Sequence, residues 1–296
     1  MASVNGNLYE LLVCPNCGAS PKPDVEDCPG CDRSILASGG GIDLLADEFR
    51  AEAEVFSVQY RALRKAEGWI GPGGREDPDD GLPRLWMSHA KLVGEAVAIV
   101  ANELTGGLRP VVADVGSGGG WAERLLPTAA VIAIDVLDVQ CSSALTVRGD
   151  MRKLPLRDKS VDAALYAASL HYSHARDCIP EAARVLRPGG LLIAVDSPIY
   201  PNPRAQAEAV VRTATYYKKA GYPNLAAHYH PVEVGELRSV LGVSGFRIER
   251  LELGSGAGRL WRRLGMRPPS SLLLARKRQL RRPTEPQCPI RLTYSS

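Results

Sequence analysis

One glycine-rich turn constrains the fold of this chain more than any other feature. Residues 111–120 read Val-Val-Ala-Asp-Val-Gly-Ser-Gly-Gly-Gly, and a helix-compatible segment at 121–126 follows directly. An apolar β-branched run that ends in glycines and continues into a helix brings bare backbone N–H groups close to a ligand. The next apolar run ends in Asp135, about 20 residues after the turn, where an acidic side chain is expected to bind ribose hydroxyls. The pattern therefore predicts a nucleoside-bearing cofactor.

Strands and helices that alternate from residue 109 onward predict an α/β fold. Apolar strand candidates occupy residues 111–115, 131–135, 161–167 and 191–196. A helical pattern over 175–186 ends at Arg187-Pro-Gly-Gly190, which combines a basic side chain with strong helix-stop residues. Such alternation is typical of a parallel sheet that is covered on both faces. Two later extended runs, 246–252 and 270–275, predict a terminal hairpin pairing.

We expect the 296 residues to form four regions. They are a cysteine-containing module at 1–45, a helical linker or lid at 46–108, an α/β domain at 109–277 with a cap insert at 198–232, and a basic, disordered tail at 278–296. Hydrophobic residues make up 45% and charged residues 23%, which is typical of a soluble globular protein. We find no apolar run of about 18 residues and no signal-peptide pattern, so we expect a cytoplasmic protein without a membrane partner.

Two cysteine pairs near the N-terminus have the spacing of a metal site. Cys14 and Cys17 form the first C-x2-C pair, and Cys28 and Cys31 form the second. In a chain without a secretion signal, such pairs indicate a metal rather than disulfides, and four thiolates complete the coordination of a structural zinc ion. The metal would supply the folding free energy that so short a module lacks. Reduced free thiols or redox pairs are the alternative.

The residue after the glycine turn distinguishes between two kinds of nucleotide-like cofactor. Dinucleotide-binding folds use G-x-G-x-x-G, in which the third glycine lets helix and strand pack closely. Trp121 occupies the position of that third glycine, where its indole would obstruct such packing. The Lys-Ser/Thr pair of a P-loop is absent as well. A compact G-x-G-x-G turn fits an amino-acid-bearing ligand better, and we interpret Trp121 as a packing or wall residue.

An ordered set of motifs resembles the class I S-adenosylmethionine-dependent methyltransferases, in particular those that act on small molecules and quinones. The set comprises Asp114-Val-Gly-Ser-Gly-Gly-Gly120, Asp135, Gly149-Asp150-Met151, Leu154-Pro-Leu156 and Arg184-Val-Leu-Arg-Pro-Gly-Gly190. The resemblance covers residues 109–277. It implies a Rossmann-like, doubly wound, mostly parallel seven-stranded sheet with an antiparallel last strand.

The same resemblance implies which residues bind the cofactor S-adenosylmethionine. Gly116, Ser117 and Gly118 would contact its methionine part, and Asp135 would bind the ribose hydroxyls. The adenine would lie between Asp150 and Met151. The remaining members of the expected site are Gly120 and Asp114, of which Asp114 would order the turn or reach the methionine amine.

The cysteine module has a resemblance of its own, to zinc-ribbon segments that precede some methyltransferases. Cys-Pro-x-Cys-Gly, the second cysteine pair and Gly40-Gly-Ile-Asp-Leu-Leu45 carry it. One such group methylates a guanine of large-subunit ribosomal RNA, but residues 46–108 lack the linker pattern of that group. The module could therefore serve folding and docking, or it could recognise the substrate.

Candidate general bases lie in segments that should line the pocket at the carboxyl ends of the strands. They are His171 and Tyr172 after the fourth strand, Asp196 and Tyr200 after the fifth, and His228 and His230 in the cap insert. An imidazole near its ordinary pKa of about 6.5 can accept a proton at neutral pH. The alternative is that these histidines only shape the wall, since a base is needed only where the acceptor must lose a proton.

Three functions are consistent with these residues. The first is transfer of a methyl group from S-adenosylmethionine to a small organic acceptor by in-line displacement. The second is methylation of a base in ribosomal or transfer RNA, with the zinc ribbon and late basic residues holding the RNA, although the net charge of +3 gives that reading little support. The third is a non-catalytic cofactor-binding or docking protein, because no candidate base stands out.

Overall fold

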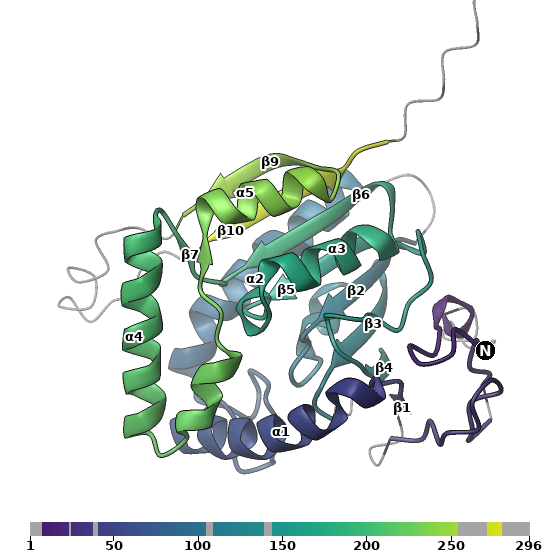
Figure 1. Ribbon diagram of the computed structural model, residues 1–296, viewed down its shortest axis with the longest axis horizontal. Coiled ribbons are helices and arrows are strands. Elements are labelled where there is room, and N and C mark those ends of the chain that lie inside the picture. The colour runs from purple at the N-terminus through teal and green to yellow at the C-terminus, as the bar shows by residue number, and fades with distance from the viewer. Residues whose placement is uncertain are drawn as a thin grey trace, which may run out of the picture.

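The computed structural model describes residues 8–23, 25–37, 41–104, 109–138, 144–253 and 271–279. In this part of the chain the centre is an eight-stranded sheet of order β1-β4-β3-β2-β5-β6-β10-β9 (Figure 1). The strands are β1 (Ile42–Asp43), β4 (Leu145–Arg148), β3 (Ala130–Asp135), β2 (Val111–Val115), β5 (Val161–Ala167), β6 (Leu186–Val195), β10 (Leu272–Lys277) and β9 (Phe246–Glu252). The first six are parallel, and β10 is antiparallel to both neighbours. The expected doubly wound sheet is confirmed, with β1 as an additional edge strand.

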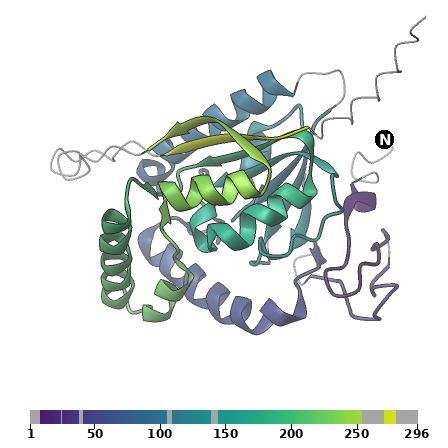
Figure 2. The same cartoon turned by 45° about the horizontal axis from the view of Figure 1, so that its top comes forward.

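Helices cover both faces of the sheet, as the apolar strands predict. One face packs against α2 (Pro83–Glu103) and the 3-10 helix η2 (Trp121–Leu125), and the other against α3 (Ala175–Val185) and α5 (Val234–Val243). Figure 2 shows α3 and α5 side by side on their face. Every residue of β3 is buried, since both of its faces are covered.

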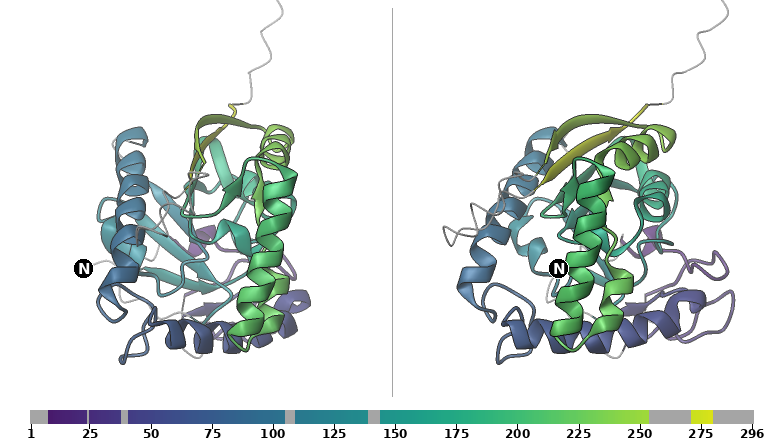
Figure 3. Two further views of the ribbon diagram at one scale, coloured as in Figure 1. Left: turned by 90° about the vertical axis from the view of Figure 1, so that its left-hand side faces the viewer. Right: turned by 60° about the vertical axis from the view of Figure 1, so that its left-hand side comes forward.

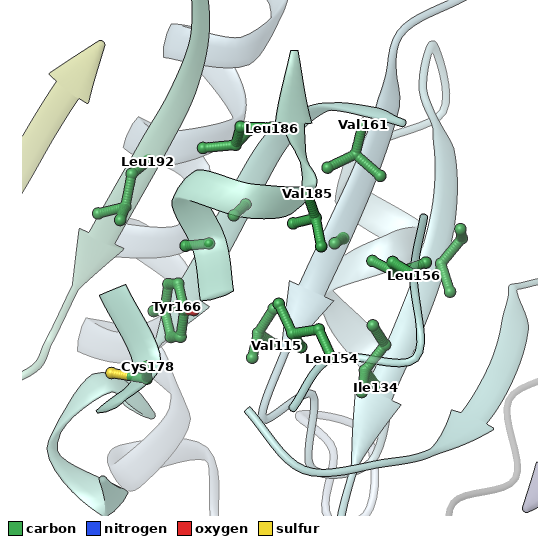
Figure 4. Close-up of a cluster of buried hydrophobic side chains, with 14 of the residues drawn as sticks. Val115, Ile134, Leu154, Leu156, Val161, Tyr166, Cys178, Val185, Leu186 and Leu192 are labelled. Atoms are coloured by element: carbon green, nitrogen blue, oxygen red, sulfur yellow. The ribbon is translucent and has the colours of Figure 1, made fainter. Parts of the chain in front are cut away.

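The core on the α3 side contains side chains from several strands and from the loop at 154–156. Figure 4 shows Tyr166 and Cys178 close together in this cluster, with Val115 and Ile134 nearer the glycine turn. Cys178 has no exposed surface and packs as a small apolar residue. Cys141 lies outside the described residues.

A layer of helices crosses the carboxyl ends of the parallel strands. It consists of α1 (Asp47–Glu67), α4 (Pro203–Lys219) and the 3-10 helix η4 (Pro223–His228). Figure 3 shows α4 and η4 against one end of α1. Leu63 of α1, Tyr217 of α4 and Leu225 of η4 are buried against one another. The tyrosines of the cap insert therefore help to pack the cap onto the lid helix.

The sequence prediction differs from the structure at several boundaries. Two short strands of the main sheet, β1 and β4, were not predicted. Strand β6 begins at Leu186 rather than at residue 191, because Leu186 pairs with Val161. The segment after the glycine turn forms a 3-10 helix and not an α-helix. Most of the predicted tail, from residue 280 onward, lies outside the described residues. In the part of the chain that the structure covers, no helix has both the length and the apolar character to span a membrane.

The cysteine module packs on the β4 side of the sheet. Leu12 forms a bridge with Leu156, and the backbone N–H of Arg157 donates to the carbonyl of Leu11 at 2.8 Å. The chain then supplies β1, which pairs with β4. The small 3-10 helix η1 (Tyr9–Leu11) lies in the same contact region, while η3 (Leu170–Tyr172), β7 (Ile199–Tyr200) and β8 (Val232–Glu233) lie between the larger elements.

Candidate active site

The glycine turn is held open by its backbone conformation and by contacts with the end of β3. Gly116, Gly118 and Gly120 have φ angles of 71°, 55° and 69°, which L side chains rarely adopt. The N–H groups of Gly116 and Ser117 donate to the carbonyl of Ile134 at 2.8 and 3.1 Å. The N–H of Gly118 donates to Asp135 at 2.8 Å. The turn and the acidic residue that the sequence paired with it therefore form one unit.

Gly116→Ala is expected to destabilise the protein by about 2 kcal/mol, because its Cβ would lie 2.4 Å from Cβ of Ser169 on a left-handed backbone. Gly221→Ala is the matched control, since Gly221 has φ of 87° but an added Cβ would meet nothing within 4 Å. Urea denaturation of both variants measures the difference. Equal losses of stability would show that the contact with Ser169 contributes nothing beyond backbone strain.

A cavity of about 320 Å³ lies beside this turn, at the carboxyl ends of the parallel strands. At one end it is lined by residues that follow β3 and β4, namely Asp135, Val136, Leu137, Gly149 and Met151. The turn lines its middle, and residues that follow β5 and β6 line the opposite end. The cavity thus runs along the strand ends from β4 to β6, with α1 and α2 contributing further walls.

Two buried carboxyl groups stand at the β2 and β3 ends. Burial raises the pKa of Asp135 to about 6, although the N–H groups of Leu137 and Gly118 favour its charged form. Burial and the neighbouring charge of Asp135 raise the pKa of Asp114 to about 7. In the described part of the chain neither oxygen of Asp114 has a hydrogen-bond partner. Both groups would be stabilised in the ionised form by hydroxyl donors or by a cationic ligand.

At the β6 end, the cavity meets a buried histidine–carboxylate pair and an aromatic wall. Nδ1 of His89 on α2 lies 3.0 Å from the carboxylate of Asp196, which follows β6. The indoles of Trp69 and Trp121 pack edge-on against Trp86, with ring centroids 5.2 and 5.3 Å apart. All five side chains line the cavity, so this end combines an apolar aromatic wall with an imidazole and a carboxylate.

The lid helix α1 adds charged groups to the cavity wall. The hydroxyl of Tyr60 donates to Glu76 at 3.1 Å, and Arg64 donates to the hydroxyl of Tyr172 at 2.7 Å and to Glu67 at 2.8 Å. Burial raises the pKa of Glu76. Tyr60, Arg64 and Glu76 belong to no recognisable motif, so local sequence patterns do not select them.

Comparison with known proteins identifies the region that carries this cavity. Residues 113–194, which include the glycine turn, match a family model described as a methyltransferase domain. The chain contains a methyltransferase domain.

Relatives of the methyltransferase domain resemble only parts of this chain. An uncharacterized methyltransferase from Mycobacterium tuberculosis is 41% identical over 90 residues, which cover 27% of this chain and 37% of that protein. The 25S rRNA (adenine(645)-N(1))-methyltransferase of Schizosaccharomyces pombe is 25% identical over 152 residues, covering 51% of this chain and 43% of its own. The chain therefore matches less than half the length of either relative.

A solved structure supports the fold of the methyltransferase domain. Geranyl diphosphate methyltransferase in complex with GPP and sinefungin superimposes with a TM-score of 0.50 at 16% identity, covering 77% of this chain and 99% of that one. At this identity the likeness shows the fold alone.

The structure brings together six of the predicted site residues around the main cavity of the methyltransferase domain. They are Gly116, Ser117, Gly118, Asp135, Met151 and His171. Gly120 and Asp114 do not line it. His171 is buried, and burial together with the charge of Arg64 lowers its pKa to about 3, so it is neutral but weakly basic at pH 7.

Three other predicted residues, Asp150, His228 and His230, line a smaller cavity of about 90 Å³ that shares Met151 with the first. Asp150 accepts hydrogen bonds from the side chain of Arg152 at 2.8 and 2.9 Å. His228 lies 3.2 Å from Glu52 of α1, and the ring of His230 packs 3.9 Å from that of His174. The assignments of Asp150, His228 and His230 to the cofactor site or to catalysis stay predictions.

The four N-terminal thiols converge on one point. All Sγ atoms of Cys14, Cys17, Cys28 and Cys31 lie within 4.8 Å of one another. The separations between Cys14 and Cys31 and between Cys17 and Cys28 are 3.9 and 3.5 Å. A tetrahedral zinc site with Zn–S bonds of about 2.3 Å requires roughly 3.8 Å between sulfurs. The thiols therefore fit the geometry of a tetrahedral zinc site.

Proposed function

We propose that this protein transfers the methyl group of S-adenosylmethionine to a small organic acceptor. The observation that carries the proposal is the single cavity that joins the glycine turn and Asp135 at one end to His89, Asp196 and an aromatic wall at the other. Methyl transfer is an in-line displacement, so it depends on holding a cofactor and an acceptor in one aligned space.

The residues at the β2, β3 and β4 ends fit the cofactor. Asp135 offers carboxylate oxygens to ribose hydroxyls, and Val136, Leu137 and Met151 offer apolar contacts for the adenine. The glycine turn lets the methionine part approach the backbone, and the nearby carboxyl of Asp114 favours a cation. When bound, the sulfonium cofactor supplies an activated methyl group. The protein supplies alignment and exclusion of water.

A small acceptor is favoured by the lid over the cavity. Phe56, Tyr60 and Arg64 of α1 line the cavity directly, and α4 and η4 pack against α1 from outside. An acceptor must therefore fit beneath α1, next to the residues that follow β5 and β6. A folded RNA would need a base extruded into this space.

Methylation of an RNA base is the second candidate, and the relative in Schizosaccharomyces pombe favours it because its name describes ribosomal RNA methylation. The cysteine module would then contribute to RNA recognition. We propose in either case that Cys14, Cys17, Cys28 and Cys31 hold a structural zinc ion, because four thiolates leave no open position for catalysis.

Isothermal calorimetry and a methyl-transfer screen test these proposals. We expect S-adenosylmethionine and its demethylated product to bind with micromolar affinity. Radiolabelled S-adenosylmethionine should transfer its methyl group to a small molecule from fractionated cell extract. Label recovered in RNA alone would favour the second candidate, and absence of cofactor binding would contradict both.

A further inference from the structure

His89 and Asp196 form a pair that connects two distant parts of the chain. Their side chains are 8% and 6% exposed, yet both line the cavity. Burying an ionisable pair costs free energy unless its geometry is well matched, and here Nδ1 and the carboxylate oxygen are 3.0 Å apart. The pair faces the cavity because α2 packs beside β6 and the chain turns sharply after that strand.

The backbone at Asp196 is strained in a way that directs its carboxylate. Asp196 has a φ of 55°, and Ala168, which directly follows β5, has a φ of 56°. Left-handed conformations of non-glycine residues cost free energy and cluster at functional sites. The N–H of Asp196 donates to the carbonyl of Ser271 at 3.2 Å, so β10 helps to hold this turn.

We propose that His89 is the general base that removes the proton from a phenolic hydroxyl of the acceptor, and that Asp196 is the residue that positions its imidazole. This inference rests on the proposed methyl transfer and names its acceptor class. With Nδ1 held by Asp196, Nε2 is the nitrogen that meets the acceptor proton. The carboxylate also stabilises the imidazolium that forms.

The position of the pair along the cavity fits the acceptor end. The strand ends follow the order β4, β3, β2, β5 and β6, so Asp135 and the glycine turn mark the cofactor half. Asp196 follows β6, beyond the turn and on the opposite side from Asp135. The transferred methyl group would thus lie between the cofactor half and His89.

The wall around His89 fits a flat aromatic molecule. The indole of Trp86 lies 5.6 Å from the His89 ring, and that of Trp121 lies 5.3 Å from it. Indole faces and edges bind aromatic rings in stacked or edge-on arrangements. Arg64, 6.0 Å from the Trp69 ring, supplies a positive charge within the same cavity and would stabilise a developing phenolate.

A phenolic hydroxyl is the acceptor group that best matches a histidine base. A neutral amine attacks through its lone pair and needs no prior deprotonation. An imidazole removes the proton of a phenol, whose pKa is about 10, more readily than that of the far less acidic aliphatic hydroxyl. In the step, Nε2 accepts the phenolic proton as the oxygen bonds to the methyl carbon. The carbon–sulfur bond breaks with its electron pair left on sulfur, and the imidazolium later returns the proton to solvent.

The binding of 4-nitrophenol tests this step, because its phenolate absorbs visible light and its phenol does not. The full-length protein is first saturated with S-adenosylhomocysteine, and that binding is measured by calorimetry. We expect bound 4-nitrophenol to ionise at a lower pH than free 4-nitrophenol. Its methyl ether, 4-nitroanisole, is the ligand control without a proton.

His89→Asn separates catalysis from structure. The Asn amide can still donate to Asp196 in place of Nδ1, but it has no group in place of Nε2. We expect it to bind S-adenosylhomocysteine within twofold of wild type and to lose the ionisation shift. With unsubstituted phenol, which is almost fully protonated at pH 7, it should lower kcat for labelled methyl transfer by about 100-fold or more. Asp196→Asn should lower kcat by a smaller factor and shift the pH–rate profile.

Other charged and titratable groups in the cavity also affect the pH–rate profile. Arg64 of α1, Glu76 of the 71–81 loop and His171 of η3 line the same cavity as the pair. His171→Gln is the rival variant: if it abolishes the ionisation shift while His89→Asn retains it, the proposal is overturned. Normal cofactor binding without any ionisation or methylation of 4-nitrophenol overturns the phenol assignment and leaves methyl transfer itself standing.

Discussion

Replacing Cys14 with serine is expected to abolish binding of the proposed zinc ion and to lower the free energy of unfolding by roughly 4 kcal/mol or more. This decrease in stability should exceed the one expected from unfolding of the cysteine module alone, because the module is part of the main core. Cys14 and Cys28 are buried in the same cluster as Leu12, Leu154 and Leu156. Without the metal, the contacts that fix residues 8–37 and β1 on the edge of the sheet should weaken.

Metal analysis and thermal denaturation check this expectation. Wild-type protein should contain about one zinc per chain, and Cys14→Ser should contain almost none. Cys178→Ser is the matched control, because this buried thiol lies in the α3 core and is not one of the four converging cysteines. It should lose stability but keep its zinc. Metal-free wild-type protein with unchanged stability would contradict a structural metal.

The fold could be predicted wherever a strand is long and covered on both faces. The strands β2, β3 and β5 each bury nearly every residue, so their apolar runs were visible in the sequence. β4 has four residues, and β1 has two and exists through its pairing with β4. Segments this short have no measurable periodicity, because their conformation depends on the neighbouring strand rather than on local pattern.

The two halves of the site differ in how much the sequence could reveal. The proposed cofactor half consists of a turn and the residues at the ends of β3 and β4, so local motifs single out Gly116, Asp135 and Met151, which line the cavity. The proposed acceptor half joins His89 to Asp196, which are 107 residues apart. Nothing local connects them, since packing of α2 beside β6 creates the contact. The sequence signal for Asp196 is its position directly after a strand. For His89 it is the spacing from Trp86, which places both residues on one face of a helix.

Asp135→Asn is expected to weaken binding of S-adenosylmethionine by about 100-fold, equivalent to ~2.8 kcal/mol. The carboxylate accepts the N–H groups of Gly118 and Leu137, each at 2.8 Å, and its remaining lone pairs are available to ribose hydroxyls. In Asn one of these oxygens becomes an NH2 group, which faces an N–H donor with donors of its own, so the substitution disturbs the turn as well as the ligand. Calorimetry measures the affinity directly. Asp162→Asn is the control, because Asp162 accepts the N–H of Val111 and pairs with Arg187 outside the cavity.

The same variant should change how binding depends on pH. In the free protein the pKa of Asp135 is raised to about 6, so part of the population is protonated below neutral pH. Ribose hydroxyls donate to the ionised carboxylate and thus lower this pKa in the complex. Binding near pH 6 should release protons, and the contribution of Asp135 to the affinity should rise between about pH 5 and pH 7 and then level off. Calorimetry in buffers of different ionisation enthalpy measures that release. In Asp135→Asn only the contribution of Asp114 should remain, at a lower pH than in wild type because the charge of Asp135 no longer raises the pKa of Asp114. An unchanged proton release would show that Asp135 does not contact the cofactor.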